Sequence, residues 1–147
     1  MLESRKGSGR QIALLLLDLD FFKRINDSHG HPAGDSCLVE AARRIEEVAA
    51  QRGGLVARFG GEEFVVALAC RDAQDALQVA EAIRLRIQQD PVRHEALAIR
   101  LSVSIGIHTV SSDRGSSAEE IIRIADEALY RAKDDGRNCV RHSLTTA

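Results

Sequence analysis

Four acidic residues in two short motifs are the first candidates for chemistry in this chain. Asp18 and Asp20 close an apolar run, and Glu62 and Glu63 follow a pair of glycines. Asp18 and Asp20 are two residues apart, so on a strand their side chains point to the same face. If the glycine turn lies beside the first apolar run, up to four carboxylates meet at one end of a sheet.

Carboxylates that lie this close together need a compensating interaction. Two bare carboxylates about 4 Å apart repel each other by about 4 kcal/mol at an effective dielectric constant near 20. They are tolerated if a pKa rises or if a cation lies between them. Magnesium held jointly by carboxylates and phosphates fits this donor set. Either motif alone could be a group of solvated acids at a strand end or turn, but the two together favour a metal site.

Candidate phosphate ligands lie on both sides of this acidic group in the sequence. Phe21, Phe22 and Lys23 follow Asp20 directly, and a helical turn there would offer free N–H groups and an ammonium to phosphate oxygens. Lys133 and Arg137 are four residues apart at the end of a predicted helix. They suit a triphosphate, although cations at this place also complement the helix dipole.

A polar stretch over residues 26–35 supplies candidates for binding a base, namely Asn26, His31 and Asp35. A carboxylate opposite the N1–H and 2-amino groups of guanine accepts two hydrogen bonds, and adenine lacks this pair of donors. Asp35 could equally be the N-cap of the next helix. His29 and His31 have no further nitrogen or sulfur ligand nearby, so zinc is not favoured.

Apolar periodicity predicts the elements that must position these residues. Short apolar runs predict strands, and residues 97–108 alternate as one long strand with a single apolar face. Gly60-Gly61 predicts a two-residue hairpin, because glycine tolerates the positive φ of such turns. The predicted strands are 12–19, 55–59, 64–69, 97–108 and a short one at 139–141; the predicted helices are 38–49, 72–89 and 117–132.

The last predicted helix has the clearest end signals. Ser117 and Glu120 have capping-box spacing, and Gly136 stands where a C-cap glycine belongs. The order β-α-β-β-α-β-α predicts an α+β fold, a mostly antiparallel sheet with flanking helices. We expect a loose tail over residues 1–10 and one domain over 11–147.

The composition limits the classes of function. The 147 residues suit one domain. A net charge of -2 and 3% aromatic residues do not favour nucleic-acid binding. Three scattered cysteines, Cys37, Cys70 and Cys139, favour neither a disulfide framework nor zinc. No apolar run approaches the roughly 20 residues of a membrane span, and the start has no signal-peptide core. The sequence therefore predicts a cytoplasmic protein.

Five ordered blocks resemble the GGDEF family of diguanylate cyclases, in the variant with Glu62 in the signature. They are DLDFFKRIND at 18–27, GHPAGD at 30–35, RFGGEEF at 58–64, SVSIGI at 102–107 and ADEALYRAKDDGRN at 125–138. The resemblance implies the ferredoxin-like palm fold of class III nucleotide cyclases. It also implies condensation of two GTP molecules into cyclic di-GMP and two pyrophosphates, with one GTP held by each of two facing copies of the domain.

The resemblance also assigns a role to each candidate residue. Two Mg²⁺ ions, or Mn²⁺ in their place, would be bound by Asp18, the Leu19 carbonyl and Glu62. Glu62 or Glu63 would help to deprotonate the ribose 3′-OH. The remaining assignments are phosphate binding by Lys23, Lys133, Arg137 and the amides near Phe21 and Phe22, and guanine or ribose binding by Asn26, His31 and Asp35.

The chain departs from the family pattern at two places. The Arg-x-x-Asp site of product inhibition is replaced by Gln51-Arg52-Gly53-Gly54, so we expect no inhibition through it. The D-x-L-T-G-L-x-N-R segment ahead of the first strand is missing. We therefore expect either a fragment of a larger signalling protein, which could be membrane-attached, or a chain without a helix that packs on the sheet.

Three other functions fit parts of the pattern. A regulatory module could bind GTP without turnover, although retention of the metal ligands favours an enzyme. A phosphoacceptor domain could use Asp18 and Asp20, but the hairpin and the lack of alternating β-α units count against it. A mononucleotide cyclase would share the fold, and Asp35 and Asn26 would then select guanine. Pyrophosphate release from GTP distinguishes an enzyme from a sensor.

Overall fold

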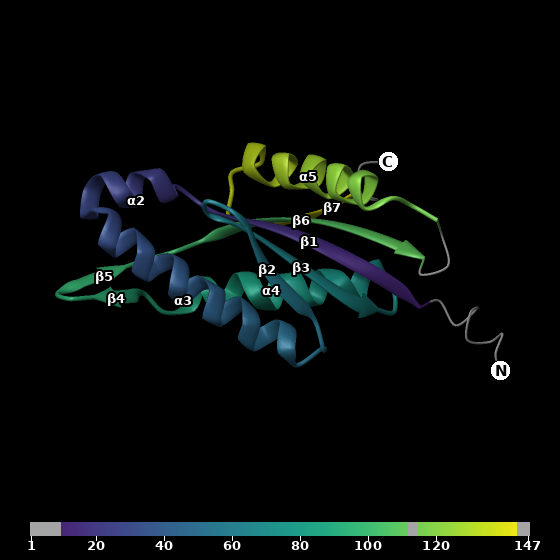
Figure 1. The fold of residues 1–147 in the computed structure, drawn as a ribbon, viewed down its shortest axis with the longest axis horizontal. Coiled ribbons are helices and arrows are strands. Elements are labelled where there is room, and N and C mark those ends of the chain that lie inside the picture. Colours follow the sequence, from purple (N-terminus) through teal and green to yellow (C-terminus); the bar gives the residue numbers. More distant parts are fainter. Residues whose placement is uncertain (1–9, 112–114, 144–147) are drawn as a thin grey trace.

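The computed structural model describes residues 10–111 and 115–143, which form two sheets and four helices (Figure 1). The elements are β1 (Gln11–Leu19), α2 (Phe22–His29), α3 (His31–Ala50), β2 (Leu55–Gly60), β3 (Glu63–Cys70), α4 (Ala73–Gln89), β4 (Val92–His94), β5 (Leu97–Ile99), β6 (Val103–Ser111), α5 (Ala118–Asp134) and β7 (Val140–His142). None of these helices is long and apolar enough to cross a bilayer.

β1 lies at the centre of a five-stranded sheet with the order β2-β3-β1-β6-β7. It pairs antiparallel with both β3 and β6, and only β7 pairs parallel, along β6. A central strand needs apolar side chains on both faces, and the run from Ala13 to Leu17 supplies them, because Leu15 and Leu16 point to opposite faces and are both buried. The predicted α+β fold with a mostly antiparallel sheet is confirmed.

Helices cover the two faces of the sheet unequally. On one face α3 and α4 pack over the main core, which includes Leu15, Phe64 and Ile105. On the other face α5 lies along β1 and β6 (Figure 1), where Leu16 packs against Leu129. The end of α5 is thereby brought to the end of β1.

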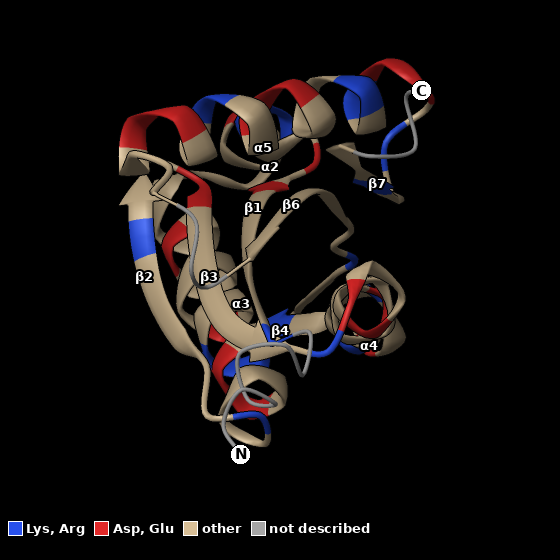
Figure 2. Cartoon of the chain, turned by 90° about the vertical axis from the view of Figure 1, so that its right-hand side faces the viewer, with Lys and Arg blue, Asp and Glu red and all other residues tan. Residues whose placement is uncertain are grey.

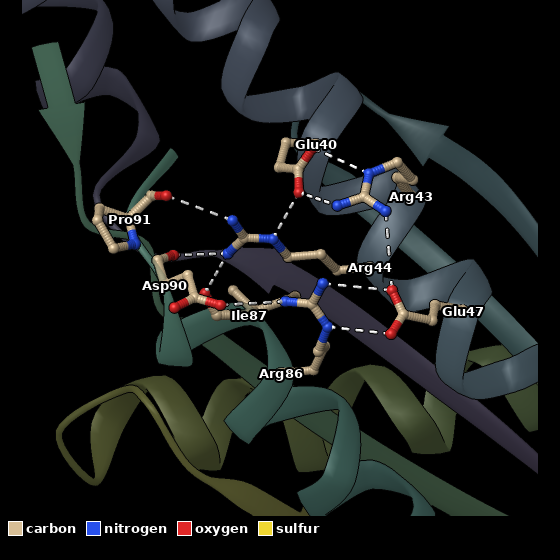
Figure 3. A network of polar contacts seen from close by, with 8 residues as sticks. All are labelled: Glu40, Arg43, Arg44, Glu47, Arg86, Ile87, Asp90 and Pro91. Atoms are coloured by element: carbon tan, nitrogen blue, oxygen red, sulfur yellow. Dashed lines mark hydrogen bonds and ion pairs between the residues drawn. The ribbon is translucent and has the colours of Figure 1, made fainter. Parts of the chain in front are cut away.

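A buried arginine joins α3 to α4, as Figure 3 shows. The Arg44 side chain is 4% exposed. Its Nη1 donates to the carbonyl oxygens of Ile87 at 2.9 Å and Asp90 at 2.7 Å, and its Nε donates to Glu40 at 2.8 Å. The guanidinium therefore satisfies carbonyl groups that the end of α4 leaves without helical donors.

The single long strand expected over 97–108 is wrong. β5 ends at Ile99 and pairs with β4 in a separate two-stranded sheet, and β6 begins at Val103. β1 ends where Leu19 pairs with Val103, so the residues before Val103 have no strand of the main sheet to pair with. Apolar residues alternate across this break, but in β6 every residue from Val103 to Ile107 is buried, because helices cover both faces of the sheet there.

The polar stretch 26–35 is helical, which the sequence analysis missed. α2 ends at His29, and α3 begins at His31 with Gly30 as its N-cap and a proline in its first turn. Asp35 lies inside α3, so its predicted N-cap role is wrong. Proline at the start of a helix loses no hydrogen bond. The signal was weak because these helices bury few side chains here, such as Ile25 and Ala33.

The predicted ends of α5 are confirmed. The Ser117 hydroxyl accepts a hydrogen bond from the Glu120 N–H at 3.1 Å, and Gly136 follows the helix with φ +118°. The expected N-terminal tail lies outside the described residues except for Arg10, which is exposed.

We expect Gly106→Ala to destabilise the fold, because α5 touches β6 at this glycine. An added Cβ would lie 2.2 Å from the Leu129 nitrogen and 2.4 Å from the Ala125 oxygen. Both are backbone atoms, so the whole helix must shift, at a cost of about 1–3 kcal/mol or more. Urea denaturation measures the change in unfolding free energy. Gly115→Ala, with nothing within 4 Å of its Cβ, is the control and should change little; equal stabilities would contradict the close packing.

Candidate active site

The acidic tip of the β2–β3 hairpin lies against the end of β1. Asp18 and Glu63 are directly opposed in the β1–β3 register, and the Leu19 N–H donates to the Glu62 carbonyl at 3.2 Å. Figure 2 shows acidic residues at the ends of β1 and β3 that lie nearest α5. The expected juxtaposition of the two acidic motifs is therefore observed.

The hairpin turn differs in one detail from expectation. β2 extends through Gly60, which pairs with Glu63, so Gly61 and Glu62 form the turn. Neither Gly60 nor Gly61 has a positive φ, so the expected reason for glycine is wrong. A register shift between Arg58 and Gly60 redirects the chain instead, as bulges do.

Lys133 partly neutralises the acidic group. Its Nζ lies 2.5 Å from the Asp18 carboxylate, which is 8% exposed. Burial raises the pKa of Asp18, the Lys133 hydrogen bond opposes this rise, and the charge of Glu62 adds to it. Burial also raises the pKa of Glu63, with a further contribution from Asp18. Ionising these acids therefore costs the folded state free energy, and a second cation would offset that cost.

The acidic edge fits magnesium shared with a ligand better than a metal held by protein alone. In the described part of the chain, no three His, Cys, Asp or Glu side chains are arranged as a metal site. Mg²⁺ commonly uses one or two carboxylates and takes its other ligands from phosphates and water. Asp18, whose pKa is raised mainly by burial in spite of Lys133, and the neighbouring Glu62 match that donor set. Leu19 follows Asp18 as the last residue of β1, and its N–H donates to the Glu62 carbonyl.

Asp20 anchors the backbone here and has little capacity for a metal. It is 5% exposed, and its oxygens accept hydrogen bonds from Ser104 at 2.6 Å, Ser102 at 2.6 Å and the Asn138 N–H at 3.0 Å. One carboxylate thereby ties the end of β1 to β6 and to the segment after α5.

The chain turns sharply from β1 into α2 at Phe21. Phe21 has φ 56°, the left-handed conformation, and caps α2 without a side-chain hydrogen bond. Phe22 is buried in the core, whereas Lys23 points to solvent, 89% exposed, and pairs with Asp27 at 3.2 Å. The free N–H groups of the α2 N-terminus are thus placed beside the acidic edge, whereas the Lys23 ammonium is paired with Asp27 and not with that edge.

Arg137 reaches the same edge from the segment after α5. It follows α5 with φ 65°, and its guanidinium carbon lies 5.0 Å from the centre of the Phe21 ring. Arg24, from α2, lies 4.4 Å from the same ring. Lys133 and Arg137 therefore both lie at the end of β1, and Arg24 lies there with them. The sequence did not indicate Arg24, because its place depends on its contact with the Phe21 ring.

The packing of α2 against α3 places the Asn26 side chain against Gly34, the residue that precedes Asp35 in α3. The Asn26 Oδ1 atom is buried without a hydrogen-bond partner in the described chain, and it occupies the space that a Cβ at Gly34 would need. Asp35 is exposed and lines a groove of about 510 Å³ between α3 and β2, with Leu38 on its wall. His31 is exposed at the start of α3. The orphaned amide and the neighbouring carboxylate are suited to hydrogen-bonding a base.

Comparison with known proteins agrees with this geometry. Residues 2–139 match the family model described as "Diguanylate cyclase, GGDEF domain". Diguanylate cyclase A of Treponema denticola is 40% identical over 88% of this chain. The chain spans only about a third of that relative, 34% of its length.

Solved structures share the fold over nearly the whole chain. The GGDEF domain of DgcB from Caulobacter crescentus, in complex with c-di-GMP, has a TM-score of 0.84 and 32% identity, covering 97% of this chain and 82% of that one. The active GGEEF domain of a diguanylate cyclase from Vibrio cholerae has a TM-score of 0.81 and 28% identity, covering 96% of this chain and 87% of that one.

We expect Gly34→Ala to weaken binding of a guanine nucleotide with little loss of stability. Gly→Ala within a helix usually stabilises by about 1 kcal/mol, but this Cβ would lie 1.8 Å from Asn26 Oδ1 and must displace the amide. Affinity should fall about tenfold, or about 1.4 kcal/mol, in a titration with a non-hydrolysable GTP analogue. In an Asn26→Ala background the same substitution should add no further loss; an equal loss there would contradict a role through Asn26.

Proposed function

The chain belongs to the GGDEF family of diguanylate cyclase domains, and from this premise we propose that it condenses two GTP molecules into cyclic di-GMP and two pyrophosphates. The observation that carries the proposal is the meeting of Asp18, Glu62 and Glu63 with Lys133 at one sheet end. Acids and cations placed together this way suit a charged triphosphate and its metal ions better than a neutral ligand.

Each domain would hold one GTP at the end of β1. The N–H groups near Phe21 and Phe22 would bind phosphate oxygens, as helix N-termini do, and Lys133 and Arg137 would neutralise the phosphates. Lys23 could join them only by releasing Asp27. Asn26, Asp35 and His31 would contact guanine or ribose. Because α2 carries both Asn26 and the phosphate-facing turn, it would fix the base relative to the triphosphate.

The reaction is an attack by a ribose 3′-oxygen on the α-phosphorus of the GTP held by a second copy of the domain. The new O–P bond forms as the bond to the β-phosphate oxygen breaks, and pyrophosphate leaves. Glu62 or Glu63 would accept the 3′-OH proton, and burial raises the pKa of Glu63, which makes it a better base than an ordinary carboxylate.

Two magnesium ions complete the proposed site. They would be held by Asp18, the Leu19 carbonyl and Glu62, with Mn²⁺ as an alternative, and when bound they offset the repulsion between acids and triphosphate and activate the attacking oxygen. The ion pair of Asp18 with Lys133 competes with metal binding by the Asp18 carboxylate. We infer that Lys133 moves its contact from Asp18 to the phosphates when the metal binds.

Glu62→Gln should abolish product formation and leave the fold intact. The substitution removes a metal-binding carboxylate but keeps the backbone carbonyl that Leu19 uses. We expect at least a 100-fold loss, on the order of general-base contributions, when cyclic di-GMP and pyrophosphate are quantified after incubation with GTP and Mg²⁺.

Glu119→Gln, an exposed acid in the first turn of α5, is the matched control and should retain activity. Turnover by Glu62→Gln equal to that of this control would refute the assignment. If the unsubstituted chain bound GTP but released no pyrophosphate, it would be a regulatory module instead.

Cyclic di-GMP should not bind tightly at residues 51–54. The one arginine there, Arg52, is committed to the buried Asp75 at 2.7 Å, and Gly54 offers no carboxylate. Calorimetry with cyclic di-GMP, the active site being blocked by a GTP analogue, should therefore show no tight binding. Tight binding that Arg52→Ala removes would contradict this prediction.

A further inference from the structure

A pocket of about 440 Å³ lies between α2 and the segment 98–102, next to the candidate active site. Basic side chains line both of its walls: Arg24 and His29 come from α2, and Arg100 comes from the segment between β5 and β6. Its volume is within the range of small-ligand sites. Its position at the turn after β1 makes it continuous with the residues proposed to bind phosphates.

The positive charge of this pocket is not compensated by the protein. Neither Arg24 nor Arg100 has a carboxylate partner in the described chain, whereas arginines elsewhere, such as Arg86 and Arg123, pair with glutamates. The single acid that lines the pocket is Asp20, and its oxygens already accept hydrogen bonds from two serines and a backbone N–H. Two free guanidinium groups facing one cavity favour an anion there.

The Phe21 ring connects this pocket to the active site. Arg24 and Arg137 both place their guanidinium carbons within 5.0 Å of its centre. The ring's π face attracts each cation, but the two like charges repel each other. Phe21 holds this position in a left-handed conformation that a bulky residue rarely adopts. An anion bound near this ring would be attracted by both guanidinium groups.

We propose that Arg24 and Arg100 bind a diphosphate group in this pocket. Guanidinium groups form paired hydrogen bonds with phosphate oxygens, and arginines from two walls would grip the anion from both sides. The diphosphate could come from the pyrophosphate that leaves in the proposed reaction, or from the terminal phosphates of a nucleotide still bound beside Phe21. The choice of diphosphate over other anions rests on the proposed function.

Calorimetric titration with inorganic pyrophosphate tests the proposal. Arg24→Ala and Arg100→Ala should each weaken binding about tenfold, the order expected for one charge-assisted phosphate contact. Arg93→Ala is the matched control, because Arg93 is also exposed and without a carboxylate partner in the described residues, yet it lies outside this pocket. Far-ultraviolet circular dichroism verifies that each variant is folded.

The outcomes separate this pocket from the active site itself. Lys133→Ala should retain pyrophosphate binding that Arg100→Ala weakens. If Lys133→Ala abolished all binding while Arg24→Ala and Arg100→Ala matched Arg93→Ala, the pocket would be no diphosphate site and the proposal would be overturned. Because the titration requires no turnover, an inactive enzyme would not by itself decide the result.

A second titration, with a non-hydrolysable GTP analogue, identifies the source of the diphosphate. Equal weakening of analogue and pyrophosphate by Arg100→Ala would show that the terminal phosphates of the bound nucleotide reach the pocket. Weakening of pyrophosphate alone would show a separate place for the leaving group. Either result supports a diphosphate site.

Discussion

The antiparallel pairing of β1 with β3 is the constraint on which the site depends. It sets Asp18 opposite Glu63 and places the hairpin tip beside Leu19. A slip of one residue would turn every side chain of β1 to the other face of the sheet. Such a slip is prevented by the buried leucines, since Leu15 and Leu17 fill the main core while Leu16 fills the space under α5. The core therefore holds the acids together against their own repulsion.

α5 connects that core to the candidate active site. Its body is held by the close contact of Gly106 with Leu129, and its end delivers Lys133 to Asp18. The segment beyond it is fixed separately, because Asp20 accepts the Asn138 N–H. Asp18 and Asp20, two acids of one motif, thus have different roles. Asp18 keeps a raised pKa and the capacity to bind a cation, whereas Asp20 is saturated by hydrogen bonds.

The features that depend on local sequence patterns were predicted correctly. The acidic pairs, the hairpin and the capped ends of α5 follow from residue type and spacing alone, and each is present. Predictions from the sequence were wrong where the structure of a segment depends on a partner far away in the chain. The strand expected over 97–108 breaks because β1 ends opposite Val103. Asp20, grouped at first with the other acids, accepts hydrogen bonds from Ser102, which precedes β6, and from Ser104 in β6. The place of Arg24 could not be foreseen either, because it depends on the left-handed turn at Phe21.

The charges at the end of β1 are separated in a way that would give a bound nucleotide a single orientation. Carboxylates gather on the β3 side, where Glu63 lies opposite Asp18. Arg24 and Arg137, which have no carboxylate partner among the described residues, lie at the Phe21 ring. A triphosphate with its metals would lie with the reacting phosphate near the acids and its terminal phosphates toward the arginines, since the opposite orientation would set phosphates against carboxylates. In the proposed reaction, the same separation would draw the leaving pyrophosphate away from the attacking oxygen. The two proposals therefore have one electrostatic origin, although they can fail independently.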